Sequence, residues 1–335
     1  MAAGAEGVAA VLTTPDGAEA TDTRLSAGAH YRAGSTTKAF LATVVLQLVG
    51  EGRLSLADPV CEPLPGVVTG NGHDGCRVTL RQLLQHTSGL PDYTAVPGAF
   101  PVARSPESYR AHRFDHRDPA GLVAAALTRP PAFAPGTGFA YSNTNYLLAG
   151  MIVERVTGRS WRAEVTDRVI RPLGLTGTFL PGDDPALPAP YARGRETFPG
   201  GDRPTDTTLL NGTAAGAAGE LVTTARDLNR FLTALLGGEL LAPAELAAMR
   251  DTRPVPGAPG HGYGLGLAAA PLSCGGSYWH HDGTTLGFTG ANGVTADGTR
   301  AVTVWTNGHD SADPARQARV EAAMRALVDH ALCGD

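Results

Sequence analysis

The sequence is unusually poor in lysine. Lysine and arginine together number 27 among its 335 residues, and only one of them, Lys38, is a lysine. An arginine side chain stays protonated in proteins, whereas a lysine can lose its proton when it is buried or lies near another cation. Lys38 is therefore a candidate for proton chemistry, although most lysines simply lie in solvent.

Clusters of basic residues and long apolar runs are also missing. The net charge is −5, and without a basic patch the chain has no electrostatic footprint for a polyanion. The longest apolar stretch, residues 40–49, contains Thr43 and Gln47 and falls short of the roughly 18 residues that a membrane span needs. We therefore expect neither a nucleic-acid partner nor a membrane span.

The first twelve residues lack the basic segment and the long apolar stretch of a secretory signal. As written, the chain therefore shows no export signal, so we expect either a cytoplasmic location or a leader that has been removed. The four cysteines point the other way if they pair locally, Cys61 with Cys76 and Cys274 with Cys333, because disulfides indicate an oxidising compartment. Four buried thiols are the alternative, and the location stays open.

No metal or cofactor is expected. The cysteines form neither a Cys-x-x-Cys motif nor a cluster with histidines at zinc spacing. His112 and His116 could form a metal pair, but no third ligand accompanies them. They lie at the end of, or just after, the stretch of residues 93–113, which is a reasonable lid over a cleft.

With 42% hydrophobic and 18% charged residues, the chain is suited to fold as a globular protein, and its length exceeds the roughly 250 to 300 residues of a single core. Apolar spacing predicts helices over residues 35–49, 78–86, 119–127, 144–156, 225–236 and 314–332, and strands over 7–13, 264–267, 287–294 and 300–307. This order predicts an α/β protein with an α/β lobe from residues 1–40 and 210–335, and a mostly helical lobe from residues 41–209.

The segment Gly34-Ser35-Thr36-Thr37-Lys38 places a nucleophile beside a base. Residues three apart on a helix share a face, so the hydroxyl of Ser35 and the amine of Lys38 point into the same space. Ser35 lies at or just inside the start of the predicted helix, where the free N–H groups and the positive potential favour a developing oxyanion.

A second candidate segment is Tyr141-Ser142-Asn143, just before an apolar helix. Beside an ammonium, a tyrosine with a lowered pKa can relay a proton, and an asparagine amide can hold both a substrate carbonyl and a lysine. On its own Tyr-x-Asn is a weak motif, and a loop tyrosine that caps the helix explains it equally well.

A third segment is His281-Asp282-Gly283-Thr284, ahead of a predicted strand. A cation or hydrogen-bond donor on an edge strand, followed by small residues, lets an extended substrate lie along that edge, with the Thr284 N–H as an oxyanion donor. His280 is expected to face away, because neighbouring residues on a strand point to opposite faces.

In this order the three segments resemble the serine penicillin-recognising family, which includes D-alanyl-D-alanine carboxypeptidases, class C β-lactamases, and esterase and transacylase branches. Ser35 and Lys38 match its Ser-x-x-Lys motif. Strings elsewhere are similar to the family's too, at residues 86–90, 172–175, 224–228 and 263–267. The resemblance implies an antiparallel sheet flanked by helices, a mostly helical lobe, and an active site between them.

The resemblance also implies an acyl-enzyme mechanism. Ser35 would attack a carbonyl, and Tyr141 with Lys38 would move the proton. Asn143 would orient the acyl side, and the amides of Ser35 and Thr284 would hold the oxyanion. The acyl group would then pass from the serine to water or to an amine.

Two positions depart from the carboxypeptidase pattern. Where the similar secreted carboxypeptidase has an arginine and a threonine for the substrate's free carboxylate, this sequence has Ala268 and Asp282. A carboxylate at that place opposes an anionic leaving group. The alternative is that Asp282 turns away and pairs with an arginine. The stretch before Ser35 is also shorter than in the secreted relatives, which favours the peptide-cyclising or antibiotic transacylase branches.

We therefore predict a serine acyl-enzyme hydrolase or acyltransferase with catalytic residues Ser35, Lys38, Tyr141 and His281. The expected substrate-binding residues are Asn143, Asp282, Gly283 and Thr284. The partners would be a small acyl donor and an amine acceptor or water, and the sequence does not indicate an oligomeric state. The alternatives are a carboxypeptidase, transpeptidase or weak β-lactamase that penicillin acylates, and a non-catalytic penicillin sensor.

Overall fold

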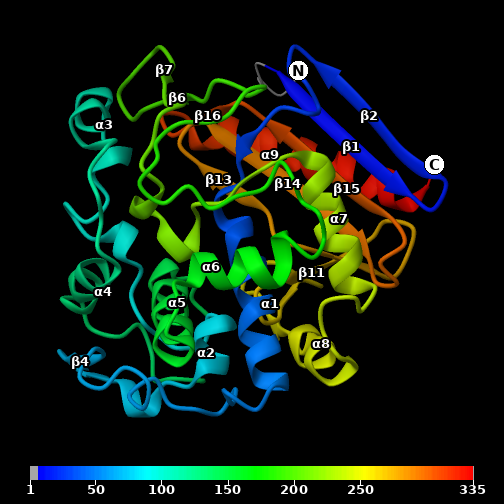
Figure 1. The fold of residues 1–335 in the computed structure, drawn as a ribbon. Helices are drawn as coiled ribbons and strands as arrows, with labels where there is room; N and C mark the ends of the chain where they lie inside the picture. The colour runs from blue at the N-terminus through cyan, green and yellow to red at the C-terminus, as the bar shows by residue number, and fades with distance from the viewer. Residues whose placement is uncertain (1–6, 335) are drawn as a thin grey trace.

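A nine-stranded antiparallel sheet forms one side of the molecule (Figure 1). The computed structural model describes residues 7–334. The strand order is β2-β1-β15-β14-β12-β11-β10-β9. The ninth strand, β13, stands outside this order and pairs with β14. The first strands of the chain therefore lie beside the last ones.

The strands of this sheet are β1 (Val8–Thr14), β2 (Gly17–Thr23), β9 (Arg253–Pro254), β10 (Gly262–Tyr263), β11 (Ala268–Pro271), β12 (Ser277–His280), β13 (Gly283–Thr285), β14 (Phe288–Thr295) and β15 (Ala301–Thr306). The remaining strands form small sheets and are β3 (Tyr31–Arg32), β4 (Thr69–Gly70), β5 (His73–Asp74), β6 (Arg195–Thr197), β7 (Thr205–Asp206), β8 (Val222–Thr223) and β16 (Gly308–Asp310). The helices are α1 (Thr37–Gly50), α2 (Leu80–Leu84), α3 (Pro106–His112), α4 (Pro119–Leu127), α5 (Asn143–Thr157), α6 (Trp161–Val165), α7 (Ala225–Leu236), α8 (Pro243–Arg250) and α9 (Pro314–Cys333).

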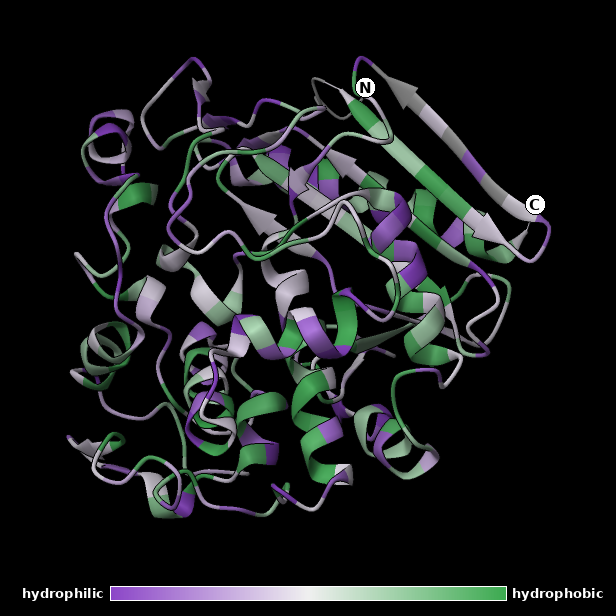
Figure 2. Cartoon of the chain, in the orientation of Figure 1, coloured by the Kyte–Doolittle hydropathy of each residue, from purple (hydrophilic) through white to green (hydrophobic). Residues whose placement is uncertain are grey.

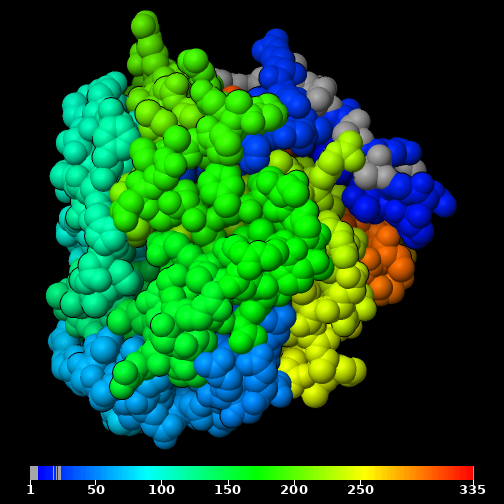
Figure 3. All heavy atoms as spheres, in the orientation of Figure 1, coloured from blue at the N-terminus to red at the C-terminus, as the bar shows by residue number. Residues whose placement is uncertain are grey.

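Two helices cover opposite faces of the sheet. On β15, Val302 and Val304 pack with Val328 of α9, whereas Thr303 between them bonds Asn229 of α7. This alternation follows from the two-residue period of a strand. In the view of Figure 1 helix α9 lies behind the sheet, and it is largely hidden in the space-filling view from the same side (Figure 3).

Helix α1 runs through the middle of the helical part of the molecule. Nearly all of its side chains are buried, and Figure 2 shows them as mostly hydrophobic. A helix that is apolar on all sides must be surrounded by other elements, and α5, α6 and α8 pack on it. The stacked rings of Phe40 in α1 and Phe231 in α7 join this helix to the sheet side of the core. The position of α1 therefore determines where Ser35 and Lys38 lie.

Residues 264–267, predicted as a strand, instead form the tight turn between β10 and β11. Gly266 has a φ of 79°, and a Cβ there would lie 2.4 Å from the Cβ of Ala42 in α1. The glycines serve a turn that packs closely against α1, and the leucines that alternate with them concealed it. The helix predicted over residues 78–86 is shorter, because α2 begins after a capping box at Thr79 and ends at Leu84.

Both disulfides that the sequence analysis considered are present in the structure. Cys61 is joined to Cys76, and Cys274 is joined to Cys333. The second disulfide links the loop between β11 and β12 to the end of α9. Within residues 7–334, no helix is long and apolar enough to cross a membrane.

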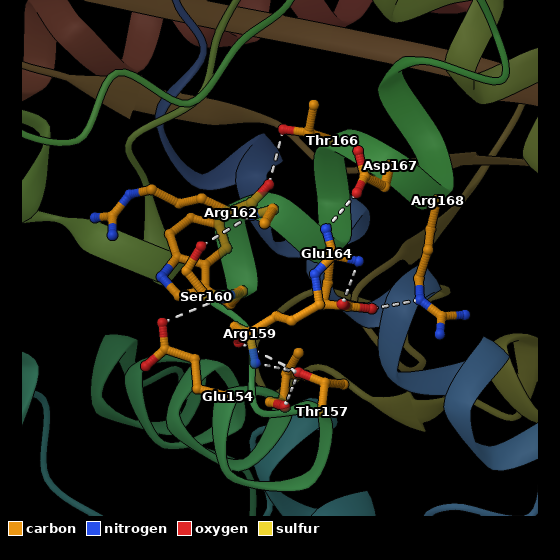
Figure 4. A network of polar contacts seen from close by, with 12 residues as sticks. Glu154, Thr157, Arg159, Ser160, Arg162, Glu164, Thr166, Asp167 and Arg168 are labelled. Atoms are coloured by element: carbon orange, nitrogen blue, oxygen red, sulfur yellow. Dashed lines mark hydrogen bonds and ion pairs between the residues drawn. The ribbon is translucent and has the colours of Figure 1, made fainter.

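A buried carboxylate of α6, Glu164, is surrounded by a network of polar contacts (Figure 4). The side chain of Glu164 is only 3% exposed and lies 2.6 Å from Nε of Arg168 and 3.1 Å from Nη1 of Arg159. Arg168 also pairs with Glu51, the residue that caps α1. A buried charge needs such partners, and this network holds α1 against its neighbour.

Candidate active site

Ser35 lies in a short 3₁₀ turn, Gly34–Thr36, that leads directly into α1. The sequence placed it at or just inside the start of a helix, and the structure places it in the turn before the first α-helical residue, Thr37. Gly34 has a φ of 54°, a conformation that favours glycine. Ser35 is half-buried and lines hollows on both of its sides.

Lys38 is fully buried beside Ser35. Its Nζ lies 3.1 Å from Oγ of Ser35, and it donates to Oδ1 of Asn143 at 2.8 Å and to the carbonyl oxygen of Ala218 at 2.7 Å. Burial lowers the pKa of Lys38 to about 7, and the carboxylate of Asp92 opposes that shift. Near neutral pH the lysine is therefore able to act as a base towards the serine.

The strand β13 packs against the turn that carries Ser35, and two glycines permit the close approach. A Cβ on Gly283 would lie 1.8 Å from the carbonyl oxygen of Ala33, and a Cβ on Gly34 would lie 2.6 Å from that of Thr284. No side chain fits at either position. The glycine of the His-x-Gly segment thus brings the backbone of Thr284 next to Ser35, where both N–H groups can face one oxyanion.

Tyr141 lies over Lys38, with its ring centroid 4.9 Å from Nζ, and it lines the same cavity as Ser35. The sequence predicted a lowered pKa for this tyrosine, and that expectation is wrong. Although 39% of the residue is exposed, its hydroxyl faces Ser35 inside the site, and burial raises the pKa well above its usual value. Tyr141 is a neutral phenol that can donate a proton and receive another.

Asn143 is the first residue of α5, and its orientation is set by Asp92. The carboxylate of Asp92 accepts hydrogen bonds from Nδ2 of Asn143 at 2.8 Å and from its backbone N–H at 3.2 Å. These contacts leave Oδ1 of Asn143 directed at Lys38. The amide assignment follows from this network of donors and acceptors.

His281 is buried and neutral rather than the cation that the sequence allowed. Burial, and then the nearby Lys38, lowers its pKa to about 3. Its Nδ1 lies 2.8 Å from the carbonyl oxygen of Asp282, so this nitrogen carries the proton. Its Nε2 accepts from the hydroxyl of Tyr263 at 2.9 Å. With both nitrogens engaged, His281 is positioned to shape the site and not to titrate near neutral pH.

Beyond Tyr141 and His281 the site opens into a cavity of about 300 Å³. Asp282 lines it and lies 3.8 Å from Nη1 of Arg325, and Nη2 of the same arginine lies 3.8 Å from Glu321. Asp282 therefore faces the cavity and does not turn away, although it does pair with an arginine. Ala268 lines the same cavity, and the guanidinium of Arg325 in its wall is shared by Asp282 and Glu321.

His280 was expected to face away from the site, and that expectation is wrong. It lines the same cavity, and its Nδ1 lies 3.3 Å from Oδ1 of Asp282. Strand β12 ends at His280, so the alternation of faces does not continue to His281 and Asp282. At the end of a strand, the alternation of side chains between the two faces no longer predicts where a side chain points.

Several residues of the site were not singled out from the sequence. Asp92 and Tyr263 contact Asn143 and His281, and His86 packs on Tyr141. The only available signal was that His86 and Tyr263 lie in strings that resemble the family. Their partners are at least 18 residues away in the chain, and no local pattern joins them.

A further missed cluster surrounds Glu196, which is fully buried. Its carboxylate accepts from the N–H of Gly287 at 2.9 Å and from Oγ of Ser311 at 2.5 Å, and it lies 2.9 Å from Nδ1 of His309. Gly287 follows β13 in the chain, so the cluster anchors the strand that carries Thr284.

His112 and His116 do not form a metal pair. His112 lies 2.7 Å from Asp115, and His116 lies 2.7 Å from Asp183. Across residues 7–334, no three histidine, cysteine, aspartate or glutamate side chains gather in an arrangement that could hold a metal ion.

A Ser-x-x-Lys pair beneath a tyrosine, facing an antiparallel strand, defines a serine hydrolase of the β-lactamase fold. Residues 1–326 match the family described as Beta-lactamase, and the chain belongs to that family of serine penicillin-recognising enzymes. The chain thus belongs to the class of enzyme, the serine penicillin-recognising enzymes, that its three motifs indicated.

Known members of the family differ in what they act on. A D-stereospecific amidohydrolase from Streptomyces sp. shares 40% identity, with a TM-score of 0.89 over 95% of this chain and 94% of its own. A D-amino acid amidase from Ochrobactrum anthropi SV3, solved with D-phenylalanine, shares 26% identity, with a TM-score of 0.82 over 97% and 94% of the two chains.

Penicillin-binding protein 4 of Amycolatopsis lactamdurans is 31% identical over 230 residues, which are 66% of this chain. The match spans 56% of that protein, so this chain corresponds to little more than half the length of the relative.

Proposed function

We propose that this enzyme is a D-stereospecific amidohydrolase that forms an acyl-enzyme on Ser35 from amides or esters of D-amino acids and passes the acyl group to water or an amine. The observation that carries the acyl-enzyme step is the contact of the buried Nζ of Lys38 with Oγ of Ser35 at 3.1 Å. Its similarity to one enzyme named as a D-stereospecific amidohydrolase and to another named as a D-amino acid amidase supports the substrate class.

In acylation, neutral Lys38 accepts the proton of the Ser35 hydroxyl while Oγ attacks the substrate carbonyl carbon. The oxyanion that forms is stabilised by the N–H groups of Ser35 and Thr284. The phenol of Tyr141 donates its proton to the leaving nitrogen or oxygen and is reprotonated from Lys38. In deacylation, water or an amine attacks the carbonyl carbon of the acyl-enzyme ester and gives a proton to Tyr141 and Lys38. These residues return a proton to Oγ of Ser35, which leaves the acyl group as a hydroxyl.

The charge of the leaving-group side supports an amide or ester over a peptide with a free carboxylate. Asp282 and Glu321 line that cavity, and its one guanidinium, Arg325, lies near both of them. A free carboxylate there would be placed beside two others, which is unfavourable in a partly dry site. A neutral or cationic amine meets no such repulsion.

The hollow on the other side of Ser35, next to Asn143, supports an apolar acyl group. Its walls include Tyr93, Phe100 and Leu286, and its volume is about 210 Å³. Such walls suit an aliphatic or aromatic side chain. Asn143 is placed to accept or donate to the polar atoms of the acyl group.

The test is hydrolysis of D-phenylalanine amide against L-phenylalanine amide by the native enzyme and by Ser35→Ala. We expect release of ammonia from the D form only, and loss of activity by at least about 10³-fold in the variant. Intact-mass measurement after incubation with a penicillin covers the main alternative. A lasting adduct on the native protein, without amide turnover, would replace this proposal with a penicillin-binding peptidase or a penicillin sensor, and no reaction with either probe would refute it.

A further inference from the structure

His86 is a buried residue of the site to which the mechanism above gives no role. Its side chain is not exposed to solvent, and its φ of 57° lies in the left-handed region that few residues other than glycine adopt. A residue persists in that region when its surroundings enforce it, and such residues are common at functional sites.

Two hydrogen bonds of His86 hold the main chain on either side of Tyr141. Its carbonyl oxygen accepts from the N–H of Ala140 at 3.0 Å, and its Nδ1 accepts from the N–H of Ser142 at 3.2 Å. The unusual backbone conformation lets one residue direct both its carbonyl and its ring at this loop. His86 thus fixes the position of Tyr141 from before and after it in the chain.

The ring of His86 also packs against the phenol ring of Tyr141. Its centroid lies 4.2 Å from that of Tyr141 and 4.8 Å from that of Tyr263, the residue that donates to His281. These contacts place His86 between the tyrosine that moves the proton and the histidine of the third motif. A shift of this ring would move both aromatic neighbours, because close-packed interiors transmit displacements.

The hydrogen bonds also determine the form of the ring. Nδ1 accepts a hydrogen bond from a backbone N–H, so a neutral ring must carry its proton on Nε2. Nε2 is buried, and within the described part of the chain it has no hydrogen-bond partner. Burial and the nearby Lys38 hold the pKa of His86 well below its usual range, which agrees with a neutral ring among aromatic side chains.

We propose that His86 is a positioning residue for the reaction and that, as the neutral Nε2–H ring, it holds the hydroxyl of Tyr141 against Ser35 and over Lys38. It acts through Tyr141 and does not touch the substrate. The inference rests on the proposed function, in which Ser35 is acylated and Tyr141 transfers the proton.

The test is a double-mutant cycle with His86→Asn and Tyr141→Phe, measured as kcat/KM and kcat on the acyl donor established for the native enzyme. Asparagine tolerates a positive φ but removes the ring that supports the phenol. In the native background we expect His86→Asn to lower kcat at least tenfold with little change in KM. In the Tyr141→Phe background the same substitution should change kcat less than twofold, because the hydroxyl that His86 positions is gone.

An equal loss in both backgrounds would overturn the proposal, since it would mean that His86 acts independently of the hydroxyl. His73→Asn is the matched control, because His73 is also a buried histidine and its ring bonds one backbone carbonyl, that of Arg129 at 2.7 Å. We expect this control to keep kcat/KM within twofold. Thermal unfolding of every variant shows whether each is folded at the assay temperature.

If His86→Asn does not fold, the same cycle is run with His86→Phe, which keeps a ring but loses the acceptor at Nδ1. The same two criteria then decide the result. Ser35→Ala separates the two proposals. Activity retained in Ser35→Ala would refute the proposed function itself, whereas a loss in Ser35→Ala together with an additive cycle would refute only the role of His86.

Discussion

The Nζ of Lys38 lies 3.1 Å from the Oγ of Ser35, and both atoms are held there by the start of one helix. Lys38 is the single lysine among the 27 basic residues of the chain. Arginine keeps its proton in proteins and cannot serve as a base. The one position with a lysine is thus the position where we propose that the side chain acts as a base.

Lys38→Arg should therefore abolish acylation while it preserves the positive charge. We expect kcat/KM to fall at least about 10³-fold, a loss typical of removing a residue that acts together with a nucleophile. The measurement is the burst of acyl-enzyme seen by intact mass in rapid-quench samples. Arg53→Lys, an exchange of the same two residue types just beyond α1, is the control and should react normally.

The activity should increase with pH along a limb set by Lys38. Its pKa is lowered to about 7, so the neutral, basic amine prevails above that pH, and kcat/KM should rise through about pH 7 and level off. Asp92 raises the pKa of Lys38, so Asp92→Asn should move this limb to lower pH. A limb that moves to higher pH would contradict the assignment of Lys38 as the base. Asp297→Asn, in the turn between β14 and β15, should leave the profile unchanged.

Asp282→Asn should change the selectivity for the leaving group. Removal of its charge relieves the repulsion of a carboxylate in the cavity that also holds Glu321. We expect the ratio of kcat/KM for D-phenylalanyl-glycine over D-phenylalanyl-glycinamide to rise about tenfold, since these substrates differ only in the carboxylate. An unchanged ratio would show that Asp282 does not face the leaving group. Glu62→Gln, on an exposed turn, serves as the charge-matched control.

Glu196→Gln should destabilise the protein and loosen the strand that carries Thr284. The buried carboxylate accepts hydrogen bonds from Gly287 and Ser311. A glutamine has only one acceptor oxygen, and its NH₂ group would face a hydrogen-bond donor. We expect the free energy of unfolding to fall by about 1 to 3 kcal/mol, the cost of an unsatisfied buried group. Glu239→Gln, which breaks the exposed pair with Arg230, should cost less than about 1 kcal/mol in the same denaturant titration.

The disulfide between Cys274 and Cys333 closes a long loop, with a sequence separation of 59 residues. Closing such a loop restricts the unfolded chain, so Cys274→Ala with Cys333→Ala should lower the free energy of unfolding by about 2 to 4 kcal/mol. Equilibrium denaturation measures this change. Identical stability of the native and variant proteins, with both cysteines shown to be unmodified thiols in the native protein, would refute the bond.

Much of the fold was accessible from local patterns. The final helix begins at Pro314 after the cap Asp313 and ends one residue past the predicted Leu332, because caps and apolar spacing act within a few residues. The segment 264–267 was misread, because its shape depends on close contact with α1 and not on its own pattern. Similarly, His280 faces the cavity because its strand ends there.

The sequence by itself determined the reactive pair, because the three-residue spacing of Ser35 and Lys38 at a helix start puts them on one face whatever surrounds them. Only the tertiary structure decided how these groups titrate. Burial lowers the pKa of Lys38 and raises that of Tyr141, and burial is a property of the packed molecule. The tertiary structure also brought His86 and Asp92 to the site, since hydrogen bonds between residues 50 or more positions apart form only when the chain has folded.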